Sequence, residues 1–335
     1  MLDTAPALRF QTMKLTIRIC SALLVAAAFN PAAAQSYPVK PVRLIIPLIP
    51  GSVSNDILGR ALAQRLSESL GQQFVADYRS GAAGTIGSAI AAKSAPDGYT
   101  LLIGYTSSIM ISPTLLSSAG FNPVNDLAPI ARFAVVPYVA VVHPSLPATN
   151  LKALVALAKA RPGQINCASA GTGGLPHLAA ELFKLIANVD IVHVPYRGAA
   201  TAHTDLLGGH MQMQFTGISG VAPAVKAGKL RALAVTATKR SELLPEVATA
   251  GESGFPTLDV SSSLGVLAPA NTPVLIVRRL HDEIAKIVSG MDMKNFILRQ
   301  GAEPALMDPA KFGAHIKAES AKWARVIKAA NIKPE

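Results

Sequence analysis

The chain of 335 residues has few cysteines, few aromatic residues and few charged residues. Two cysteines, Cys20 and Cys167, are too few for a disulfide-stapled scaffold. Lysine and arginine outnumber the acidic residues by 31 to 20, but the longest basic runs are the pairs Lys239-Arg240 and Arg278-Arg279. Nucleic-acid-binding surfaces cluster basic residues among aromatic ones, and aromatic residues make up 5% of this chain. The composition therefore argues against nucleic acid and favours small anionic ligands.

Familiar catalytic and metal-binding patterns are also missing. No serine has glycine at both −2 and +2, so the nucleophile elbow of α/β-hydrolases is absent. The seven histidines form no HExxH or HxxxH pair, and no carboxylate pattern completes a metal site around His203 and His210. The stretch "GAAGTIG" (Gly81–Gly87) lacks the Lys-Ser/Thr of a P-loop. The sequence predicts a protein that binds a ligand without reacting with it and that needs no cofactor or metal.

The first 34 residues have the pattern of a secretory signal peptide. From Met13 the chain reads "MKLTIRICSALLVAAAFNPAAAQ", with two basic residues, the apolar core Ile19–Phe29 and an A-x-A site that ends at Ala34. This core is too short for a bilayer, which needs roughly 20 apolar residues. A buried N-terminal helix is the alternative. We expect cleavage after Ala34, Met13 as the true start, and a soluble mature protein in the periplasm.

Strand-like and helix-like stretches alternate along the rest of the chain. Strands are predicted at Val42–Ile46, Phe74–Tyr78, Thr100–Tyr105, Pro137–Val142, Gln164–Ser169, Asp190–Pro195, Met211–Thr216, Arg231–Thr236 and Leu264–Ala268. Helices are predicted at Ile57–Leu70, Gly84–Ala95, Leu151–Ala160, Leu178–Ala187, Thr201–Leu207, Val274–Val288 and Asp308–Ile332. This alternation is typical of α/β proteins with parallel sheets covered on both sides by helices.

The number of helices predicts two α/β domains. The stretches between strands and helices contain no low-complexity linker, so we expect the domains to be joined by strands. The boundaries fall near residues 136 and 236. Residues 35–136 and 237–335 then form a discontinuous first domain, and residues 137–236 form the second.

Two loops that lead from a strand into a helix are the first candidates for ligand binding. The loop "PLIPGSVSND" (Pro47–Asp56) places Gly51, Ser52 and Ser54 ahead of a predicted Asn55/Asp56 helix cap, and the loop "SAGTGGLPH" (Ser169–His177) contains three glycines. Free N–H groups at a helix start bind anions, and glycine lets a ligand approach the backbone. An ordinary capped turn is the alternative for each loop. Two such loops in different domains favour ligand binding.

Two further strand ends carry polar side chains. Thr106 and Ser107 follow the Thr100–Tyr105 strand, at the end where open α/β sheets bind ligands. The stretch "VHVPYRGAA" (Val192–Ala200) places Tyr196 and Arg197 at another strand end. Arg197 could hold a carboxylate through two hydrogen bonds, and a surface position is the alternative.

Several longer stretches resemble one known family. They are "YPVKPVRLIIP" (37–47), "APDGYTLLIG" (95–104), "HPSLPATNLKALVALAKARPGQINCASAGTGGLPHLAAELF" (143–183), "VHVPYRGAATAHTDLLGGHMQMQF" (192–215), "KAGKLRALAVTATKRSELLPEVATAGESGFP" (226–256), "GVLAPANTP" (265–273) and "AKWARVIKAANIK" (321–333). With these stretches the chain resembles the Bug-type periplasmic receptors of tripartite tricarboxylate transporters over about 300 residues.

The resemblance implies a fold, a ligand and a partner. The fold would be of the periplasmic-binding-protein type, with two sheets flanked by helices, joined by two crossing strands, and a ligand cleft between the domains. The ligand would be a small organic acid held partly through bridging waters, and the partner would be the membrane permease subunits of the transporter. We expect a monomer. A receptor that signals to a sensor kinase is one alternative, and an exported serine hydrolase using Ser169 or Ser107 is another.

The resemblance also carries over residue by residue. The family loop P-F-P-P-G-G-x-x-D corresponds to Pro47–Asp56, with Leu48 in place of Phe and Ser52 in place of Gly. Thr216 takes the place of an acidic residue in an F-D-N stretch, and Ser263 that of an aromatic residue. These departures fall where the ligand would be recognised. The predicted ligand-binding residues are Leu48, Pro50, Gly51, Ser52, Val53, Ser54, Asp56, Thr106, Ser107, Ser169, Ala170, Gly171, Thr172, Gly173, His177, Tyr196, Arg197, Thr216 and Ser263.

Overall fold

The computed structural model describes residues 37–51, 54–116 and 119–333. The chain divides into two units, Met1–Val39 and Lys40–Glu335. In the first unit, residues 37–39 are described and lie in no helix or strand. The predicted signal peptide lies outside the described residues. All the elements named below belong to the second unit.

Ten strands among the described residues form one continuous sheet with two halves. We call the half that contains β1, β2, β3, β9 and β10 sheet A, and the half that contains β5, β6, β7 and β8 sheet B. The strand bounds are β1 Val42–Ile46, β2 Phe74–Tyr78, β3 Thr100–Tyr105, β4 Leu127–Val142, β5 Asn166–Ser169, β6 Val192–Pro195, β7 Met213–Gly217, β8 Arg231–Val235, β9 Ser261–Pro269 and β10 Glu303–Met307.

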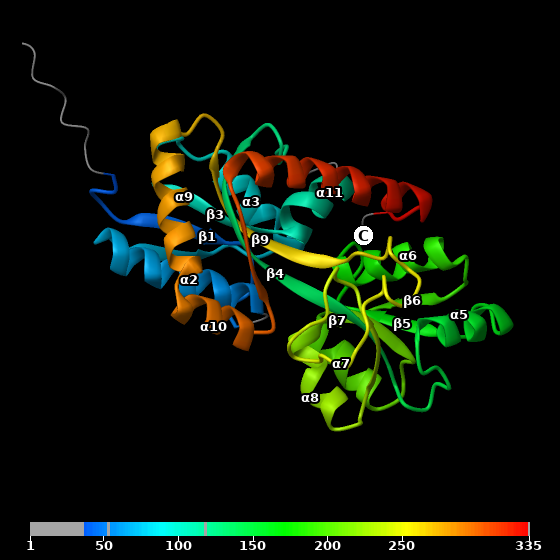
Figure 1. Cartoon of the computed structure of the whole chain (residues 1–335). Helices are drawn as coiled ribbons and strands as arrows, with labels where there is room; N and C mark the ends of the chain where they lie inside the picture. The colour runs from blue at the N-terminus through cyan, green and yellow to red at the C-terminus, as the bar shows by residue number, and fades with distance from the viewer. Residues whose placement is uncertain (1–36, 52–53, 117–118, 334–335) are drawn as a thin grey trace, which may run out of the picture. The chain divides into compact units, whose positions relative to one another are not determined.

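The strand β4 belongs to both halves. Its first part, Leu127–Pro137, pairs antiparallel with β9 in sheet A. Its second part, Tyr138–Val142, pairs antiparallel with β7, and most of that part also pairs with β8. Figure 1 shows β4 running without a break from the strands of sheet A to those of sheet B. One strand therefore connects the two halves directly.

The chain returns from sheet B to sheet A through residues 236–260. Thr236 N donates a hydrogen bond to Tyr138 O (2.8 Å), and Val260 N donates one to Thr236 O (2.7 Å). The Thr236 hydroxyl also donates to Val260 O (2.7 Å). The returning segment is thus fastened to β4 where that strand passes from one half of the sheet to the other.

Helices cover the strands on both sides. Their bounds are α2 Ser54–Leu70, α3 Thr85–Ala92, α4 Ser112–Leu115, α5 Leu151–Ala160, α6 Leu175–Ala187, α7 Ala199–Leu207, α8 Ile218–Lys226, α9 Val274–Ser289, α10 Met291–Arg299 and α11 Pro309–Ala329. Two short segments complete the set, the 3-10 turn η1 (Ala82–Gly84) and the π-helix η2 (Thr106–Ile111).

Alternating side chains of β4 show why sheet B is buried on both faces. Ala140 and Val142 pack into the core that also contains residues of α5 and α6. Val139 and Val141 point the other way, into a second core with Leu206 of α7. Successive side chains of a strand point to opposite faces, so an apolar run at each position requires cover on both sides.

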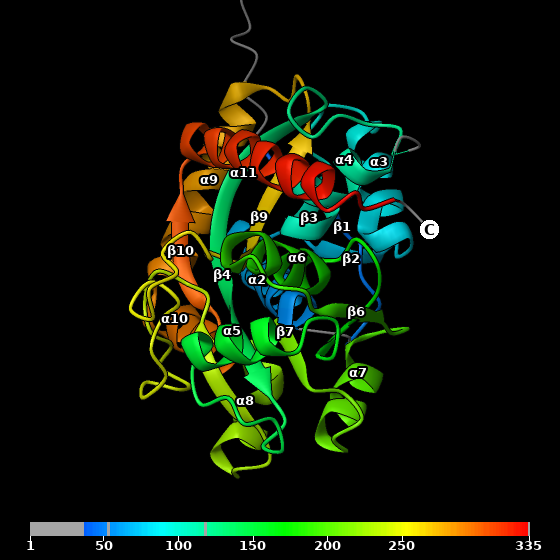
Figure 2. The ribbon, with the colours of Figure 1, turned by 90° about the vertical axis from the view of Figure 1, so that its right-hand side faces the viewer.

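The helix α11 joins the cores of the two halves. Asp308 caps it by accepting a hydrogen bond from Lys311 N (2.8 Å). Its buried face is made by Phe312, Ile316, Trp323, Val326 and Ile327. These residues belong to the same core cluster as Phe183 of α6 and Phe215 of β7. Figure 2 shows α11 next to α6, so the core continues from one half of the sheet into the other.

The alternation of strands and helices is confirmed, with three differences. The crossing strand begins at Leu127 rather than Pro137, and β-bulges near Pro129 accommodate a proline that broke the expected pattern. The elements α4, α8, α10 and β10 were not predicted, and α8 contains Pro223 in its interior. The sheet is mixed rather than parallel, because β4 and β9 run antiparallel to their neighbours. Among the described ranges, no helix is long and apolar enough to span a bilayer.

Candidate ligand-binding site

The predicted loops lie where sheet A and sheet B face each other. The first loop follows β1 and enters α2, and the second follows β5 and enters α6. A Cβ atom added to Gly173 in the second loop would meet the Leu115 side chain of α4, which follows β3 of sheet A. At the start of α2, the Ser54 hydroxyl lies 2.9 Å from the Ser219 hydroxyl of α8. Residues that are distant in sequence are thus brought together at the carboxyl ends of parallel strands.

Asp56 organises the first loop from within. Its side chain is fully buried, and it accepts hydrogen bonds from Gly51 N (2.6 Å) and from the Tyr78 hydroxyl (2.7 Å). Arg60 lies 3.4 Å from the same carboxylate. Burial and then the hydrogen bond to Asp56 raise the pKa of Tyr78 to about 12. Asp56 therefore serves as an internal acceptor for the loop. The predicted cap at Asn55/Asp56 is wrong, because α2 already begins at Ser54.

The tip of the first loop is open to solvent. Leu48 is half-buried, whereas Pro50 and Gly51 are exposed. Gly51 has a φ of 72°, a conformation that glycine adopts without strain. Two predicted binding residues, Ser52 and Val53, lie outside the described residues.

The first turn of α2 contacts both halves of the molecule. Besides its contact with Ser219, the Ser54 hydroxyl donates to Gln300 O (3.2 Å), just after α10. The Asn55 side chain donates to the Ser262 hydroxyl on β9 (3.3 Å). Since one oxygen joins α2, α8 and the end of α10, Ser54 is a structural contact between sheet A and sheet B in this structure.

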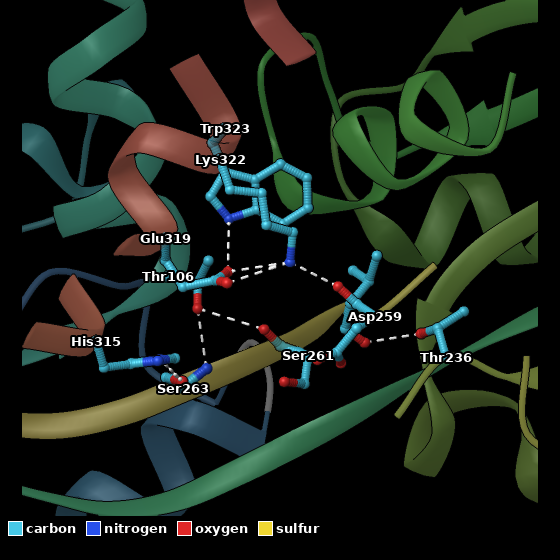
Figure 3. A network of polar contacts seen from close by, with 10 residues as sticks. Thr106, Thr236, Asp259, Ser261, Ser263, His315, Glu319, Lys322 and Trp323 are labelled. Atoms are coloured by element: carbon cyan, nitrogen blue, oxygen red, sulfur yellow. Dashed lines mark hydrogen bonds and ion pairs between the residues drawn. The ribbon is translucent and has the colours of Figure 1, made fainter. Parts of the chain in front are cut away.

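Thr106 and Ser263 form one end of a polar network that Figure 3 shows. The Thr106 hydroxyl accepts a hydrogen bond from Ser263 N (2.9 Å) and donates one to Ser261 O (3.4 Å). The Ser263 hydroxyl lies 2.9 Å from His315 Nε2 on α11. Both predicted residues are buried, so they fasten the end of β3 to β9, while Ser107 beside them is half-buried.

The rest of this network belongs to α11. Burial, and then the nearby Arg132 and Lys322, lower the pKa of His315 to about 4, so its imidazole is neutral at pH 7. The Glu319 carboxylate accepts hydrogen bonds from Lys322 Nζ (3.2 Å) and from the Trp323 indole (3.0 Å). Lys322 also donates to the backbone oxygen of Asp259 (2.7 Å), just before β9. The network therefore ties α11 to the segment that returns to sheet A.

The second loop is held by its own serine. Ser169 at the end of β5 is fully buried, and its hydroxyl accepts from Gly171 N (3.2 Å) and donates to Gly171 O (3.1 Å). The same oxygen lies 2.6 Å from His193 Nε2 on β6. Ala170, Gly171 and Thr172 are half-buried at the surface of the loop. Ser169 thus shapes the backbone beneath them.

His177 in the first turn of α6 holds the other end of this loop. Its Nδ1 accepts a hydrogen bond from Gly173 N (3.0 Å), and its Nε2 lies 3.7 Å from Glu181. Burial acts to raise the pKa of Glu181, but hydrogen bonds from His177 and Lys184 outweigh it, and the pKa is lowered. The His177 ring stacks on the His193 ring, with 3.6 Å between centroids and 9° between planes.

The remaining predicted residues line the ends of β6 and β7. The half-buried Tyr196 donates from its hydroxyl to Asp205 (2.6 Å), and this bond together with burial raises its pKa to about 12. Arg197 beside it is exposed. Thr216 is buried, and its hydroxyl lies 3.1 Å from His203 Nε2 on α7. Of these three residues, Tyr196 and Arg197 remain accessible, whereas Thr216 does not.

The Ser169 hydroxyl and His193 Nε2 are as close as a catalytic nucleophile and its base would be. The surroundings of this pair, however, differ from those of catalytic residues. The hydroxyl is inaccessible to solvent, and Gly171 N, a potential oxyanion donor, points at the hydroxyl itself.

The start of α6 is better suited to binding. Its first turn contains no acidic residue, so its positive end is not neutralised there.

Two cavities are lined by none of the predicted ligand-binding residues. One of about 230 Å³ is lined by residues of α2 and α10, including Arg60 and Phe296. Another of about 500 Å³ lies between α6 and α11 and includes Leu185, Lys322 and Arg325. Within the described ranges, no group of three or more His, Cys, Asp and Glu side chains is arranged to hold a metal ion.

Comparison with known proteins identifies the family. The model of the protein family described as "tripartite tricarboxylate transporter family receptor" matches residues 58–332. Protein BugT of Bordetella pertussis is 36% identical over 299 residues, which cover 89% of this chain and 91% of BugT. The chain therefore belongs to the family of tripartite tricarboxylate transporter receptors, and the resemblance to Bug-type receptors is confirmed. These proteins are periplasmic solute receptors.

Solved structures of similar proteins confirm the two-domain α/β fold. The R. palustris protein Rpa4515 with adipate has a TM-score of 0.78 at 35% identity, covering 89% of this chain and 100% of that one. MatC from Rhodopseudomonas palustris with bound malate has a TM-score of 0.74 at 26% identity, covering 87% of this chain and 100% of that one. Both sequence identities exceed 25% over nearly the whole chain, which agrees with the family match.

Sequence reasoning missed three groups that organise the site. His193 lies on β6, where the alternation of "VHVP" could have indicated an inward-facing polar residue. His315 is separated from Ser263 by 52 positions, and Ser219 from Ser54 by 165 positions. Neither of these pairs carries a local sequence signal.

Proposed function

We propose that the protein is an extracytoplasmic receptor that binds a small carboxylate and delivers it to the permease subunits of a tripartite tricarboxylate transporter. The observation that carries this proposal is the family match over residues 58–332. The adipate in Rpa4515 and the malate in MatC support a dicarboxylate as the ligand class. Adipate is the first candidate, because Rpa4515 is the more similar of the two structures.

We place the carboxylate of this ligand at the N-terminus of α6. The helix dipole favours an anion there, and the first turn of α6 has no competing acid. The first loop supplies the opposite wall through Leu48, Pro50 and Gly51, and we assign the remaining contacts to bridging water. Ser107, Ala170, Thr172, Tyr196 and Arg197 are the accessible side chains and backbone groups that we assign to the same site.

Movement of the two domains would enclose the ligand. We propose that residues 35–136 and 237–335 move against residues 137–236, with the hinge where β4 meets the returning segment near Tyr138 and Thr236. Such a split site lets a ligand shift an open–closed equilibrium. Small-angle scattering should show compaction when saturating ligand is added, and an unchanged scattering curve would contradict this hinge.

Export precedes this function. The pattern that ends at Ala34 supports cleavage by signal peptidase and release into the periplasm. We propose that the released protein is a monomer. Mass spectrometry of the exported protein should give a mature N-terminus at Gln35. A chain that retains Met13 after export would contradict the proposal.

A thermal-shift screen of the mature protein tests the ligand class. The screen compares adipate, malate, a monocarboxylate, a tricarboxylate and the diamide of adipic acid. A ligand that is present at a concentration 100 times its dissociation constant stabilises the folded state by about 2.7 kcal/mol. We expect adipate to raise the melting temperature and its diamide to leave it unchanged. An equal shift with acid and diamide would exclude recognition of the carboxylate.

The short contact between Ser169 and His193 favours a second candidate, an exported serine hydrolase. The burial of Ser169 argues against it. Turnover of a model ester that disappears in Ser169→Ala would establish the hydrolase, and we expect no such turnover.

A further inference from the structure

Two histidines lie directly beneath the second loop. His193 Nε2 contacts the Ser169 hydroxyl, which binds both backbone groups of Gly171, and His177 Nδ1 accepts from Gly173 N. The two rings are stacked at 3.6 Å. Each histidine thus acts on a different part of the loop, and each ring supports the other.

The hydrogen bonds determine the protonation of His177. An imidazole nitrogen that accepts an N–H must have a free lone pair, so Nδ1 carries no proton. The single proton of the neutral ring is then on Nε2, which faces Glu181. A second proton could enter only at Nδ1, where it would displace the Gly173 N–H. Protonation of His177 is therefore incompatible with this conformation of the loop.

The surroundings disfavour a charge on the partner ring. Burial and the neighbouring His177 lower the pKa of His193 to about 4. The charged groups that face the pair from α6 are Glu181 and Lys184, which pair with each other at 2.9 Å. On β5, burial raises the pKa of the Cys167 thiol to about 12, so it is neutral.

Other elements packed on α6 contribute little charge next to the pair. The segment Thr106–Leu115, formed by η2 and α4, has no ionisable side chain. Glu319, Lys322 and Arg325 of α11 face α6 beside Leu182 and Leu185. The stacked rings are thus exposed mainly to one internally neutralised pair, Glu181 and Lys184.

We propose that His177 and His193 are positioning residues for the ligand-binding loop, and that they hold it only as a neutral stacked pair. Without the His177 acceptor the Gly173 amide is released, and the loop can leave its binding conformation. The affinity for the ligand then falls. This inference rests on the proposed function, because it assigns the second loop to ligand binding.

Substitution of His177 tests the proposal by isothermal titration calorimetry with adipate at pH 8. In His177→Asn, the side-chain oxygen takes the place of Nδ1 as the acceptor of the Gly173 amide, so we expect an affinity close to that of the parent. His177→Ala leaves the Gly173 amide without its acceptor and should bind about tenfold more weakly at pH 8. His210→Asn replaces an exposed histidine and serves as the control. Circular dichroism checks that each variant is folded.

Two results would overturn the proposal. One is that a folded His177→Asn binds adipate as weakly as His177→Ala, because an acceptor for the Gly173 amide would then not restore the loop. The other is that a folded His177→Ala binds adipate as tightly as the parent at pH 8.

A measurement without ligand separates this inference from the proposed function. Two-bond ¹H–¹⁵N spectra of protein labelled with ¹⁵N-histidine report the tautomer of each ring. We expect His177 to carry its proton on Nε2 at pH 8, and a proton on Nδ1 would overturn the inference. If adipate does not bind the parent protein, the proposed ligand fails while these spectra still decide the role of His177.

Discussion

The two strand-to-helix loops of this receptor both have backbone amides that need a hydrogen-bond acceptor, and the two loops use different acceptors. In the first loop a buried carboxylate, Asp56, accepts the Gly51 amide and is balanced by Arg60 and Tyr78. In the second loop neutral groups do the same work, because the Ser169 hydroxyl and the His177 ring accept the amides of Gly171 and Gly173.

This difference determines which of the two helix starts attracts an anion more strongly. Asp56 sits in the first turn of α2, where it already neutralises the positive end of that helix. The first turn of α6 has no acidic residue, and the amides of its loop are accepted by the Ser169 hydroxyl and the His177 ring. A carboxylate ligand is therefore repelled less and attracted more at the second loop. In the proposed site the first loop would then act as a steric wall.

Removing the carboxylate of the first loop should have the largest effect. In Asp56→Ala the Gly51 amide and the Tyr78 hydroxyl lose their acceptor inside the protein, which we expect to cost about 3 kcal/mol of unfolding free energy. Urea denaturation measures this. Asp308→Ala is the control, since it removes an exposed cap of α11 worth about 1 kcal/mol. Equal losses in the two variants would show that Asp56 is an ordinary cap.

Acid should weaken the second loop. The pKa of His193 falls from 6.5 in the unfolded chain to about 4 in the folded protein. The unfolded state then binds the proton more tightly, so this group's stabilisation is present above pH 6.5 and is lost as the pH falls toward 4. We expect a loss on the order of 2 kcal/mol in urea denaturation between pH 7 and pH 4. His193→Gln keeps a polar contact to Ser169 without titrating, and a variant with the same pH dependence as the parent would contradict the assignment.

The third prediction compares two neighbouring glycines. Gly173 has a φ of 75°, and an added Cβ would also meet Leu115, so Gly173→Ala should cost about 1 to 2 kcal/mol. Gly174 has a φ of −75° and only ordinary contacts around an added Cβ, so Gly174→Ala should cost less than about 1 kcal/mol. Thermal denaturation and adipate titration of both variants measure the difference. Equal behaviour would mean that the loop adapts to a side chain at Gly173.

The smallest effect is expected for the contact between the two halves. Ser54→Ala removes one hydroxyl from the pair with Ser219 and should cost about 1 kcal/mol. A double-mutant cycle with Ser219→Ala should give a coupling of about 0.5 to 1 kcal/mol in urea denaturation. Additive losses would show that the two hydroxyls do not interact in solution.

The sequence predicted most strands, since runs such as Val42–Ile46 and Thr100–Tyr105 are apolar and bounded by turn residues. It located both loops, because glycines and helix starts are local signals. It assigned the wrong role to Asp56, since a carboxylate near a helix start looks the same whether it caps the helix or binds the loop before it. The His177–His193 stack joins two separate elements, so only the folded chain reveals it.

The place of β9 in the sheet has a consequence for the order of folding. This strand, Ser261–Pro269, lies between β3 and β4, although it follows both of them by more than a hundred residues of chain. Sheet A therefore lacks an interior strand until the last part of the chain arrives, and pairing across such a long loop is slow. A nascent chain cannot complete this domain early. Completion of sheet A therefore waits until Ser261–Pro269 has been synthesised.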